Sequence, residues 1–145
     1  MLKKIFEKKQ LRHIMKDKRD SLSQKKIKEY SSLITKKIIS LEIFQKAQVV
    51  MIYSSFKNEV DTTELLKYSF SNNKIVCLPV ILKNQDYMES FVFNQNDPLK
   101  KDEKYGIMEP DQSIAKRLDK GKIDIVFIPG LAFDLKGNRV GFGKG

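Results

Sequence analysis

The spacing of apolar residues predicts two helices within the first 40 residues. Five apolar residues recur every three or four positions, as one side of a helix requires: Ile27, Tyr30, Ile34, Ile38 and Leu41. Ser23 stands just before this stretch and is a candidate N-cap. A less regular helix is expected ahead of it, since neither segment contains proline or glycine.

Short apolar runs replace this helical period after residue 48. Residues 49–53, 74–78 and 123–128 are dominated by Val, Ile and other apolar residues, which is typical of strands buried on both faces. Residues 90–93 are a candidate for one more strand. The second half of the chain is therefore expected to form a sheet.

The first two of these strands are separated by a predicted helix. Asp61 is its expected cap, with Glu64 three residues later, and two asparagines precede the second strand. Pro79 is expected to end that strand. A strand–helix–strand unit of this length implies parallel strands. Residues 94–112 are polar and rich in turn residues, and a weak helix is predicted over 114–118.

This alternation predicts an α/β fold: a three-layer α/β/α sandwich with a mixed, mostly parallel, Rossmann-like sheet. Residues 1–145 are expected to form a single domain, as the length suggests. Ligands of such sheets bind beyond the carboxyl ends of the strands. Glu59 and the glycine-rich residues 137–145 both follow predicted strands and are therefore expected at that edge.

Composition indicates a globular protein of the cytoplasm. Hydrophobic residues make up 41% and charged residues 32% of the chain, which does not indicate disorder. No apolar run approaches the roughly 20 residues that span a bilayer, so no membrane association is expected. The N-terminus lacks the apolar core of a signal peptide. The single cysteine, Cys77, cannot form an intramolecular disulfide, which fits a reducing compartment.

The net charge of +10 is concentrated at the N-terminus, because residues 1–40 hold 13 of the 28 Lys and Arg residues but only 4 of the 18 Asp and Glu residues. A basic helical arm could bind nucleic acid. It could equally be a solvated face with one or two cations directed at a phosphorylated ligand. Aromatic residues are not interleaved with these charges, so nucleic acid is not the expected partner.

Residues 137–145 have the pattern of a phosphate-binding loop. They contain four of the seven glycines, interleaved with Arg139 and Lys144. Glycine lets backbone N–H groups approach an anion closely, and the two cations add charge. Five residues separate Gly137 from Gly143 and a glycine follows Lys144, so the pattern is neither a Walker A motif nor a dinucleotide fingerprint.

Five segments in order resemble the 5-formyltetrahydrofolate cyclo-ligase (5,10-methenyltetrahydrofolate synthetase) family. They are Lys8-Lys9-Gln10-Leu11-Arg12; Asn58-Glu59-Val60-Asp61-Thr62; Leu78-Pro79 with Met88; Tyr105-Gly106-Ile107-Met108-Glu109-Pro110; and Pro129-Gly130-Leu131-Ala132-Phe133-Asp134 with the loop 137–145. The resemblance covers the whole chain, and the last motif is specific.

The resemblance implies an ATP-dependent ligase. 5-Formyltetrahydrofolate would be converted to 5,10-methenyltetrahydrofolate with release of ADP and phosphate, through a phosphorylated formyl group. ATP and Mg²⁺ would be the cofactors and the folate the only partner, bound by a monomer. Such a phosphoryl transfer depends mainly on positioning and charge neutralisation.

The resemblance also implies roles for individual residues. Arg139 and Lys144 would be catalytic. The ATP-binding set would be Lys8, Arg12, Arg139, Val140, Gly141, Phe142, Gly143, Lys144 and Gly145. The folate-binding set would be Ser54, Glu59, Met88, Tyr105 and Phe142. No residue of this chain is expected to bind the metal, since the aspartate that does so in relatives would lie beyond Gly145.

One departure from the family concerns the C-terminus. The family motif continues after the position of Gly145 into Tyr-Tyr-Asp and a further segment, so the domain is expected to lack its C-terminal part. A chain without it is expected to be poorly stable and to have little activity. The alternatives to a ligase are an inactive fragment and a basic nucleotide- or nucleic-acid-binding domain without turnover.

Overall fold

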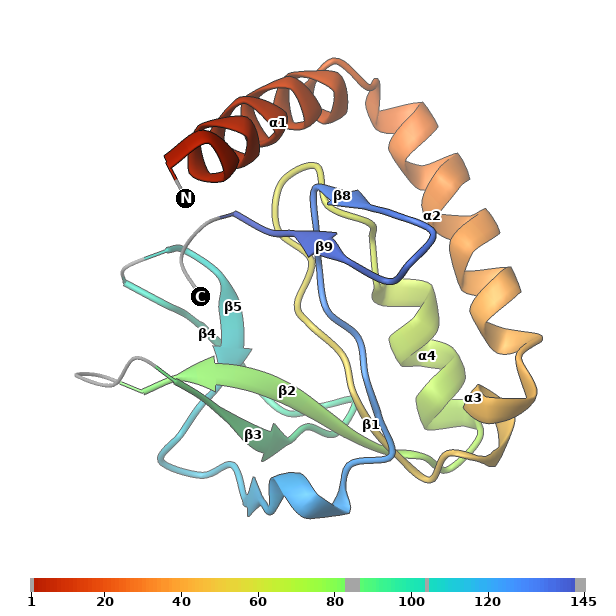
Figure 1. The fold of residues 1–145 in the computed structure, drawn as a ribbon. Helices are drawn as coiled ribbons and strands as arrows, with labels where there is room; N and C mark the ends of the chain where they lie inside the picture. The colour runs from red at the N-terminus through yellow and green to blue at the C-terminus, as the bar shows by residue number, and fades with distance from the viewer. Residues whose placement is uncertain (1, 83–86, 104, 143–145) are drawn as a thin grey trace.

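The fold is a mixed five-stranded sheet with helices packed against it (Figure 1). A computed structural model describes residues 2–82, 87–103 and 105–142, with side chains from residue 7 onward. The helices are α1 (Leu2–Asp20), α2 (Gln24–Ile39), α3 (Glu42–Lys46), α4 (Thr63–Ser71) and the short 3₁₀ helix η1 (Lys120–Lys122). The strands are β1 (Val49–Met51), β2 (Ile75–Ile81), β3 (Met88–Val92), β4 (Leu99–Lys101), β5 (Met108–Pro110), β6 (Arg117–Leu118), β7 (Ile125–Val126), β8 (Ala132–Phe133) and β9 (Arg139–Val140).

The sheet has the strand order β6-β3-β2-β1-β7. β1 pairs in parallel with β2 and β7, whereas β3 pairs antiparallel with β2 and β6. The mixed sheet is therefore confirmed, but only half of its pairings are parallel. β4–β5 and β8–β9 form two separate hairpins that the sequence did not predict.

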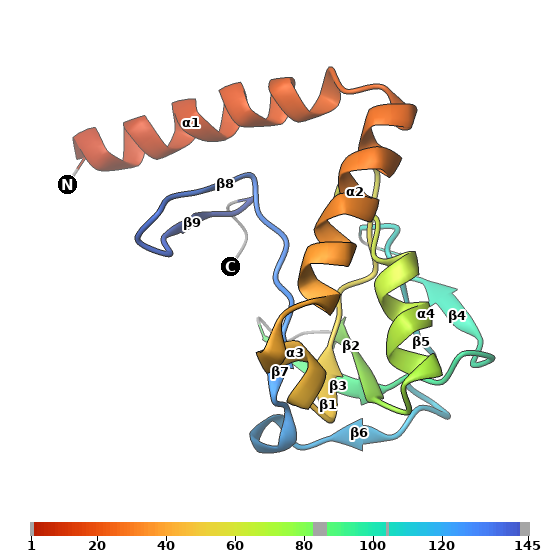
Figure 2. The same cartoon turned by 90° about the vertical axis from the view of Figure 1, so that its right-hand side faces the viewer.

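The core lies between this sheet and helices α3 and α4, which approach it from the same side (Figure 2). Phe44 and Leu65 come from these helices and pack in one cluster with Val50 of β1, Val76 of β2 and Ile52, which directly follows β1. All five side chains are at most 2% exposed. Their burial drives the helices onto the sheet. A helix layer on the opposite face is not seen in the described residues, so the three-layer arrangement stays a prediction.

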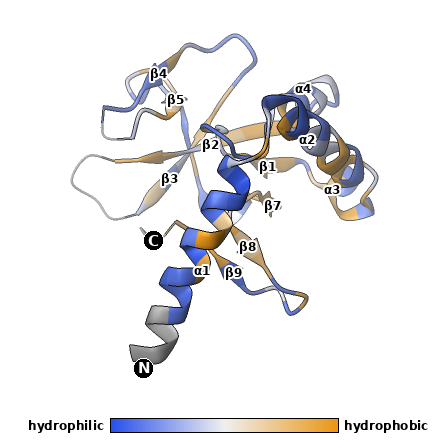
Figure 3. Ribbon diagram, turned by 90° about the horizontal axis from the view of Figure 1, so that it is seen from above, coloured by the Kyte–Doolittle hydropathy of each residue, from blue (hydrophilic) through white to orange (hydrophobic). Residues whose placement is uncertain are grey.

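The two N-terminal helices are confirmed, with Ser23 as N-cap: its side chain accepts a hydrogen bond from the Lys26 N–H. The α2 stripe is only partly buried, however, because Ile27 is 7% exposed while Tyr30 is 46% and Ile34 is 41% exposed. Helix α1 leaves the body of the domain and is mostly hydrophilic in the part that Figure 3 colours. Its position therefore depends on a few specific contacts.

Three local predictions were wrong. The N-cap of α4 is Thr62, and Asp61 instead accepts a hydrogen bond from the Thr63 N–H. Residues 117–118 form strand β6 where a helix was predicted, because Phe91 and Ser90 of β3 offer this segment a sheet edge. Pro79 lies inside β2 and does not end it.

The geometry of the sheet explains why Pro79 is tolerated. Ile75 donates its N–H to Gln48, and Cys77 accepts through its carbonyl from Ile52, so odd-numbered residues of β2 face β1. The last residue of β2 that pairs with β1 is Cys77. At Pro79 no neighbouring strand requires a donor on that side, so the missing N–H breaks no ladder bond.

Candidate active site

The N-terminal helix and the glycine-rich segment meet, although they lie at opposite ends of the chain (Figure 1). The Arg12 Nε donates a hydrogen bond of 2.9 Å to the carbonyl oxygen of Gly141, across 129 residues. Lys8 lies one turn earlier on α1 and is exposed. The i, i+4 spacing places both cations on one side of the helix. Arg12, one of the residues expected to bind phosphate, is therefore brought to the glycine-rich loop.

The start of this loop is part of a hairpin that β8 and β9 form. Asp134 accepts hydrogen bonds from the N–H groups of Lys136 and Asn138, and the Asn138 amide lowers the pKa of this carboxyl. Gly137 adopts φ +79°, which side chains with a Cβ rarely allow. The turn thus leads the chain through Arg139 to Gly141, which contacts α1.

Arg139 lies against the backbone of the preceding loop. Its Nη1 donates to the Pro129 carbonyl at 2.6 Å. A Cβ at Gly141 would lie 3.4 Å from the same Nη1, so glycine keeps space around this guanidinium. The arrangement leaves other N–H groups of Arg139 available for an anion, since guanidinium carries five donors.

A cavity of about 400 Å³ lies between α2 and the loops that follow β1 and β7, with Arg19 of α1 in its wall. Its wall is largely apolar, with Ile27, Ile34 and Ile38 from α2 and Phe127 from the β7 side. The polar groups that line it include Arg19, Tyr53 and Glu59. A mostly apolar cavity with a few convergent polar groups is typical of a small-molecule site.

Glu59 is half-buried in this cavity, as its position after the first strand suggested. Its Oε2 accepts a hydrogen bond of 3.0 Å from the Phe56 N–H. Burial raises the pKa of this carboxyl, and the Phe56 N–H and the charge of Arg19 partly oppose that rise. Burial also raises the pKa of Tyr53, whose hydroxyl donates to the Val60 carbonyl at 3.1 Å.

Arg19 is a site residue that sequence reasoning missed. It lies in the last turn of α1, half-buried against the cavity, and its guanidinium carbon is 5.0 Å from the centre of the Phe142 ring. In the sequence it is one of many basic residues of a helix that carries no distinguishing motif there. The i, i+7 spacing from Arg12 was the available signal, since it places both arginines on one side of α1.

The other predicted residues divide into three groups. Phe142 contacts Arg19, and Val140 pairs with Ala132 in the hairpin. Ser54, Met88 and Tyr105 are not among the described residues that line the cavity; Met88 is 54% exposed at the start of β3. Gly143, Lys144 and Gly145 lie outside the described residues, so the catalytic role of Lys144 stays a prediction.

No metal site is present within the described ranges, where no three His, Cys, Asp or Glu side chains gather closely enough to hold an ion. Among the helices of the described part, none combines the length and the apolar composition needed to cross a bilayer.

Comparison with known sequences identifies relatives along nearly the whole chain. Residues 4–145 match the model of the 5-formyltetrahydrofolate cyclo-ligase family. The chain is 30% identical over 139 residues to the 5-formyltetrahydrofolate cyclo-ligase of Mus musculus, covering 93% of this chain and 68% of that protein. It is 33% identical over 112 residues to the enzyme of the same name from Haemophilus influenzae, covering 77% of this chain and 60% of that protein.

The fold agrees with these sequence matches. The structure of Aquifex aeolicus 5,10-methenyltetrahydrofolate synthetase superposes with a TM-score of 0.81 at 32% identity, covering 95% of this chain and 68% of the other. The synthetase of Mycoplasma pneumoniae shares the fold with a TM-score of 0.69 at 22% identity, covering 95% and 73%. The motifs, the fold and the relatives agree, and the chain belongs to the 5-formyltetrahydrofolate cyclo-ligase family.

Proposed function

We propose that this chain converts 5-formyltetrahydrofolate to 5,10-methenyltetrahydrofolate with cleavage of ATP to ADP and phosphate. The observation that carries the proposal is the hydrogen bond from Arg12 to Gly141, which joins the glycine loop to the same helix whose Arg19 lines the cavity that contains Glu59. The family membership supports the same reaction. Because the chain spans 60–69% of relatives from Haemophilus, mouse and fission yeast, turnover by this chain alone is part of the proposal.

The cations at this junction fit the triphosphate of ATP. Lys8 and Arg12 would contact its phosphates from α1, and Arg139 would do so from β9. One guanidinium group can bind two phosphate oxygens at once, and glycine allows backbone N–H groups to approach these oxygens. ATP supplies the phosphoryl group that makes the formyl oxygen a good leaving group. Gly143, Lys144 and Gly145 complete this proposed site.

The folate would occupy the cavity, with its pterin ring next to Glu59. An ionised carboxylate accepts hydrogen bonds only, and the pterin presents N–H donors. Ser54, Met88, Tyr105 and Phe142 are proposed to contact the rest of the substrate. Once the formyl oxygen is phosphorylated, N10 attacks the formyl carbon and phosphate leaves with the oxygen. The chain's part is to hold the two ligands in reach and to balance the charge on the transferred group. Mg²⁺ would bind mainly through the ATP phosphates, because it usually takes few protein ligands, and no step is assigned to it.

The test is a spectroscopic assay of methenyl-folate formation. The product's absorbance should rise only when ATP, Mg²⁺ and 5-formyltetrahydrofolate are present together, and ADP should form in equal amount. Omission of either substrate is the control. Product formation without ATP would contradict the mechanism. Binding of both ligands without product would favour the alternative of a binding domain without turnover.

A further inference from the structure

Arg19 occupies a position that its contacts within the protein do not explain. It is half-buried beside the cavity, and its Nε is shielded from solvent, yet within the described part of the chain this atom has no hydrogen-bond partner. A shielded donor without an acceptor costs free energy, so a group that supplies an acceptor there is favoured. No described group of the protein supplies an acceptor to the Arg19 Nε.

Phe142 packs against the Arg19 guanidinium. The Arg19 guanidinium carbon lies 5.0 Å from the centre of the Phe142 ring, within the range of a cation–π contact. Phe142 follows Gly141, which Arg12 fixes through its carbonyl. The glycine loop therefore orients Arg19 at the cavity, while α1 supplies the charge.

Glu59 and Arg19 offer opposite hydrogen-bonding chemistry in the same cavity. An ionised Glu59 can only accept, and Arg19 can only donate. One Glu59 oxygen already accepts from the Phe56 N–H, and the Tyr53 hydroxyl already donates its proton to the Val60 carbonyl. A Glu59 carboxylate oxygen and the Arg19 guanidinium edge are charged groups that remain for a ligand. A planar ring that carries an N–H beside a carbonyl matches this pair.

We propose that Arg19 binds the carbonyl oxygen of the pterin ring while Glu59 accepts from its N–H groups. This inference rests on the proposed function, and it assigns a substrate-positioning role to a residue outside the family motifs quoted above. The two side chains together select an amide-like ring edge. A pterin in which the C4 carbonyl is replaced by an amino group presents a donor to Arg19 and is bound less tightly.

The experiment measures equilibrium binding of 5-formyltetrahydrofolate by calorimetry to the unaltered chain and to three variants: R19A, R19K and K18A. Lys18 is the exposed neighbour of Arg19 on α1, so K18A removes the same charge without touching the cavity. R19A should weaken binding about tenfold or more, as loss of a hydrogen bond to a charged group does. R19K should recover only part of this loss, because an ammonium lacks the planar fork. K18A should stay within about twofold of the unaltered chain.

The 4-amino analogue of 5-formyltetrahydrofolate provides the second readout. The unaltered chain should prefer the natural ligand over the analogue, and R19A should not discriminate between them. A purely structural role of Arg19 would weaken both ligands equally. Circular dichroism and thermal melting of each variant identify any loss of folding, and a folded R19K keeps the test valid if R19A unfolds.

The pH dependence of binding provides a third readout. The charge of Arg19 opposes the rise in the pKa of Glu59. In R19A the Glu59 carboxyl should therefore become protonated at a higher pH than in the unaltered chain. As the pH is lowered, R19A should lose binding before the unaltered chain does. If R19A binds both ligands as K18A does, the inference is overturned and the proposed function stands. If the unaltered chain does not bind 5-formyltetrahydrofolate, the proposed function fails and the inference fails with it.

Discussion

Arg12 and Gly141 are joined by a hydrogen bond of 2.9 Å from the guanidinium Nε to the backbone carbonyl, although 129 residues separate them. α1 projects from the domain, and its described side chains bury little surface. This bond and the contact of Arg19 with Phe142 are therefore central to how the helix lies over the glycine loop.

The first prediction concerns this contact. Arg12→Ala should weaken ATP binding about tenfold or more, because it removes a cation from the proposed phosphate site and frees the Gly141 carbonyl. The free energy of unfolding should fall by only about 0.5–1.5 kcal/mol, since the bond is part-exposed. ATP affinity and thermal melting measure the two effects.

Lys9→Ala is the matched control for Arg12→Ala. Lys9 is an exposed cation of the same helix and makes none of the contacts described for Arg12. It should change ATP affinity by about twofold at most. Equal losses in the two variants would mean that α1 acts through its overall charge and not through the Arg12 position.

The second prediction follows from the buried carboxyl of Glu59. Burial is the main cause that raises its pKa above the unfolded value, so the folded state takes up the proton more readily. This favours the folded state at low pH, and the advantage is lost as pH rises through the folded-state pKa. Glu59→Gln should therefore be more stable than the unaltered chain near pH 7 but bind folate about tenfold less tightly.

Melting temperatures between pH 4 and pH 8 test the stability half of this prediction. The amount by which Glu59→Gln melts above the unaltered chain should grow as the pH rises through the folded-state pKa of Glu59 and then level off. Glu29→Gln replaces an exposed carboxylate on α2 and should show no such pH-dependent gain. A Glu59→Gln variant that is less stable at pH 7 would show that the carboxylate contributes more through its bond to the Phe56 N–H than it loses by burial.

Much of the fold could be predicted because patterns within short stretches of sequence determine it. The apolar stripe of α2, the Ser23 cap and the runs that became β1, β2 and β7 are all short-range signals. The strand at Arg117–Leu118 could not be predicted this way, because two residues form a strand only when a neighbouring edge is already present. The prediction that Pro79 ends β2 was wrong for a similar reason. Whether a proline breaks a ladder bond depends on where the neighbouring strand ends, and β1 ends before it reaches Pro79.

The candidate site was predicted in part, and the division has a physical basis. Glu59, Arg12 and the glycine loop stand in motifs, so the sequence could single them out. Arg19 stands among other basic residues of α1, and only the fold brings it to Phe142 and the cavity. Solvent exposure separates a binding arginine from a surface one, and a single sequence does not contain that quantity.

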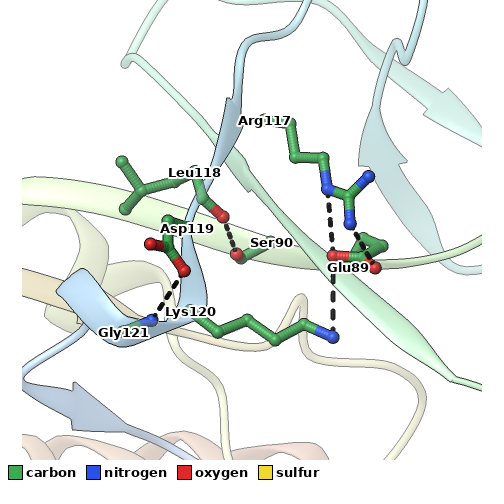
Figure 4. Close-up of polar contacts among 7 residues, drawn as sticks. All are labelled: Glu89, Ser90, Arg117, Leu118, Asp119, Lys120 and Gly121. Carbon is green, nitrogen blue, oxygen red and sulfur yellow. Dashed lines mark hydrogen bonds and ion pairs between the residues drawn. The ribbon is translucent and has the colours of Figure 1, made fainter.

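The third prediction concerns the buried ion pair at the edge of the sheet (Figure 4). Glu89 is 3% exposed and accepts from Arg117 through both oxygens, with atom distances of 3.1 Å and 2.6 Å, while Lys120 lies 3.6 Å away. Arg117→Leu would leave this carboxylate without its main partner. Loss of a fully buried pair costs roughly 3–5 kcal/mol. The Arg117 side chain is 61% exposed, so we expect about 1–3 kcal/mol.

A double substitution separates the ion pair from packing. Glu89→Leu together with Arg117→Leu should recover most of the lost stability, because no unpaired charge stays buried. Lys120→Ala should cost about 0.5 kcal/mol at most, since its side chain is largely exposed. Urea unfolding of the three variants measures these differences. If the double variant is less stable than Arg117→Leu alone, the unpaired Glu89 carboxylate is not the cause of the loss.

The fourth prediction concerns Lys74, a buried cation next to Phe44 of the core. It is 8% exposed, its Nζ donates to the backbone carbonyls of Gln45 and Ala47, and it lies 5.0 Å from the centre of the Phe44 ring. Lys74→Met keeps the apolar stem but removes the charge and all donors. Two carbonyls at the end of α3 then lose their partner, which should lower the free energy of unfolding by about 1–3 kcal/mol.

Lys67→Met is the matched control, because Lys67 is exposed on α4 and the substitution removes the same charge. Its effect should stay within about 0.5 kcal/mol. The Lys74→Met variant should also increase amide hydrogen exchange in α3, since Lys74 ties the end of this short helix to the start of β2. A stable Lys74→Met variant with unchanged exchange would mean that methionine packing on Phe44 compensates for the lost hydrogen bonds.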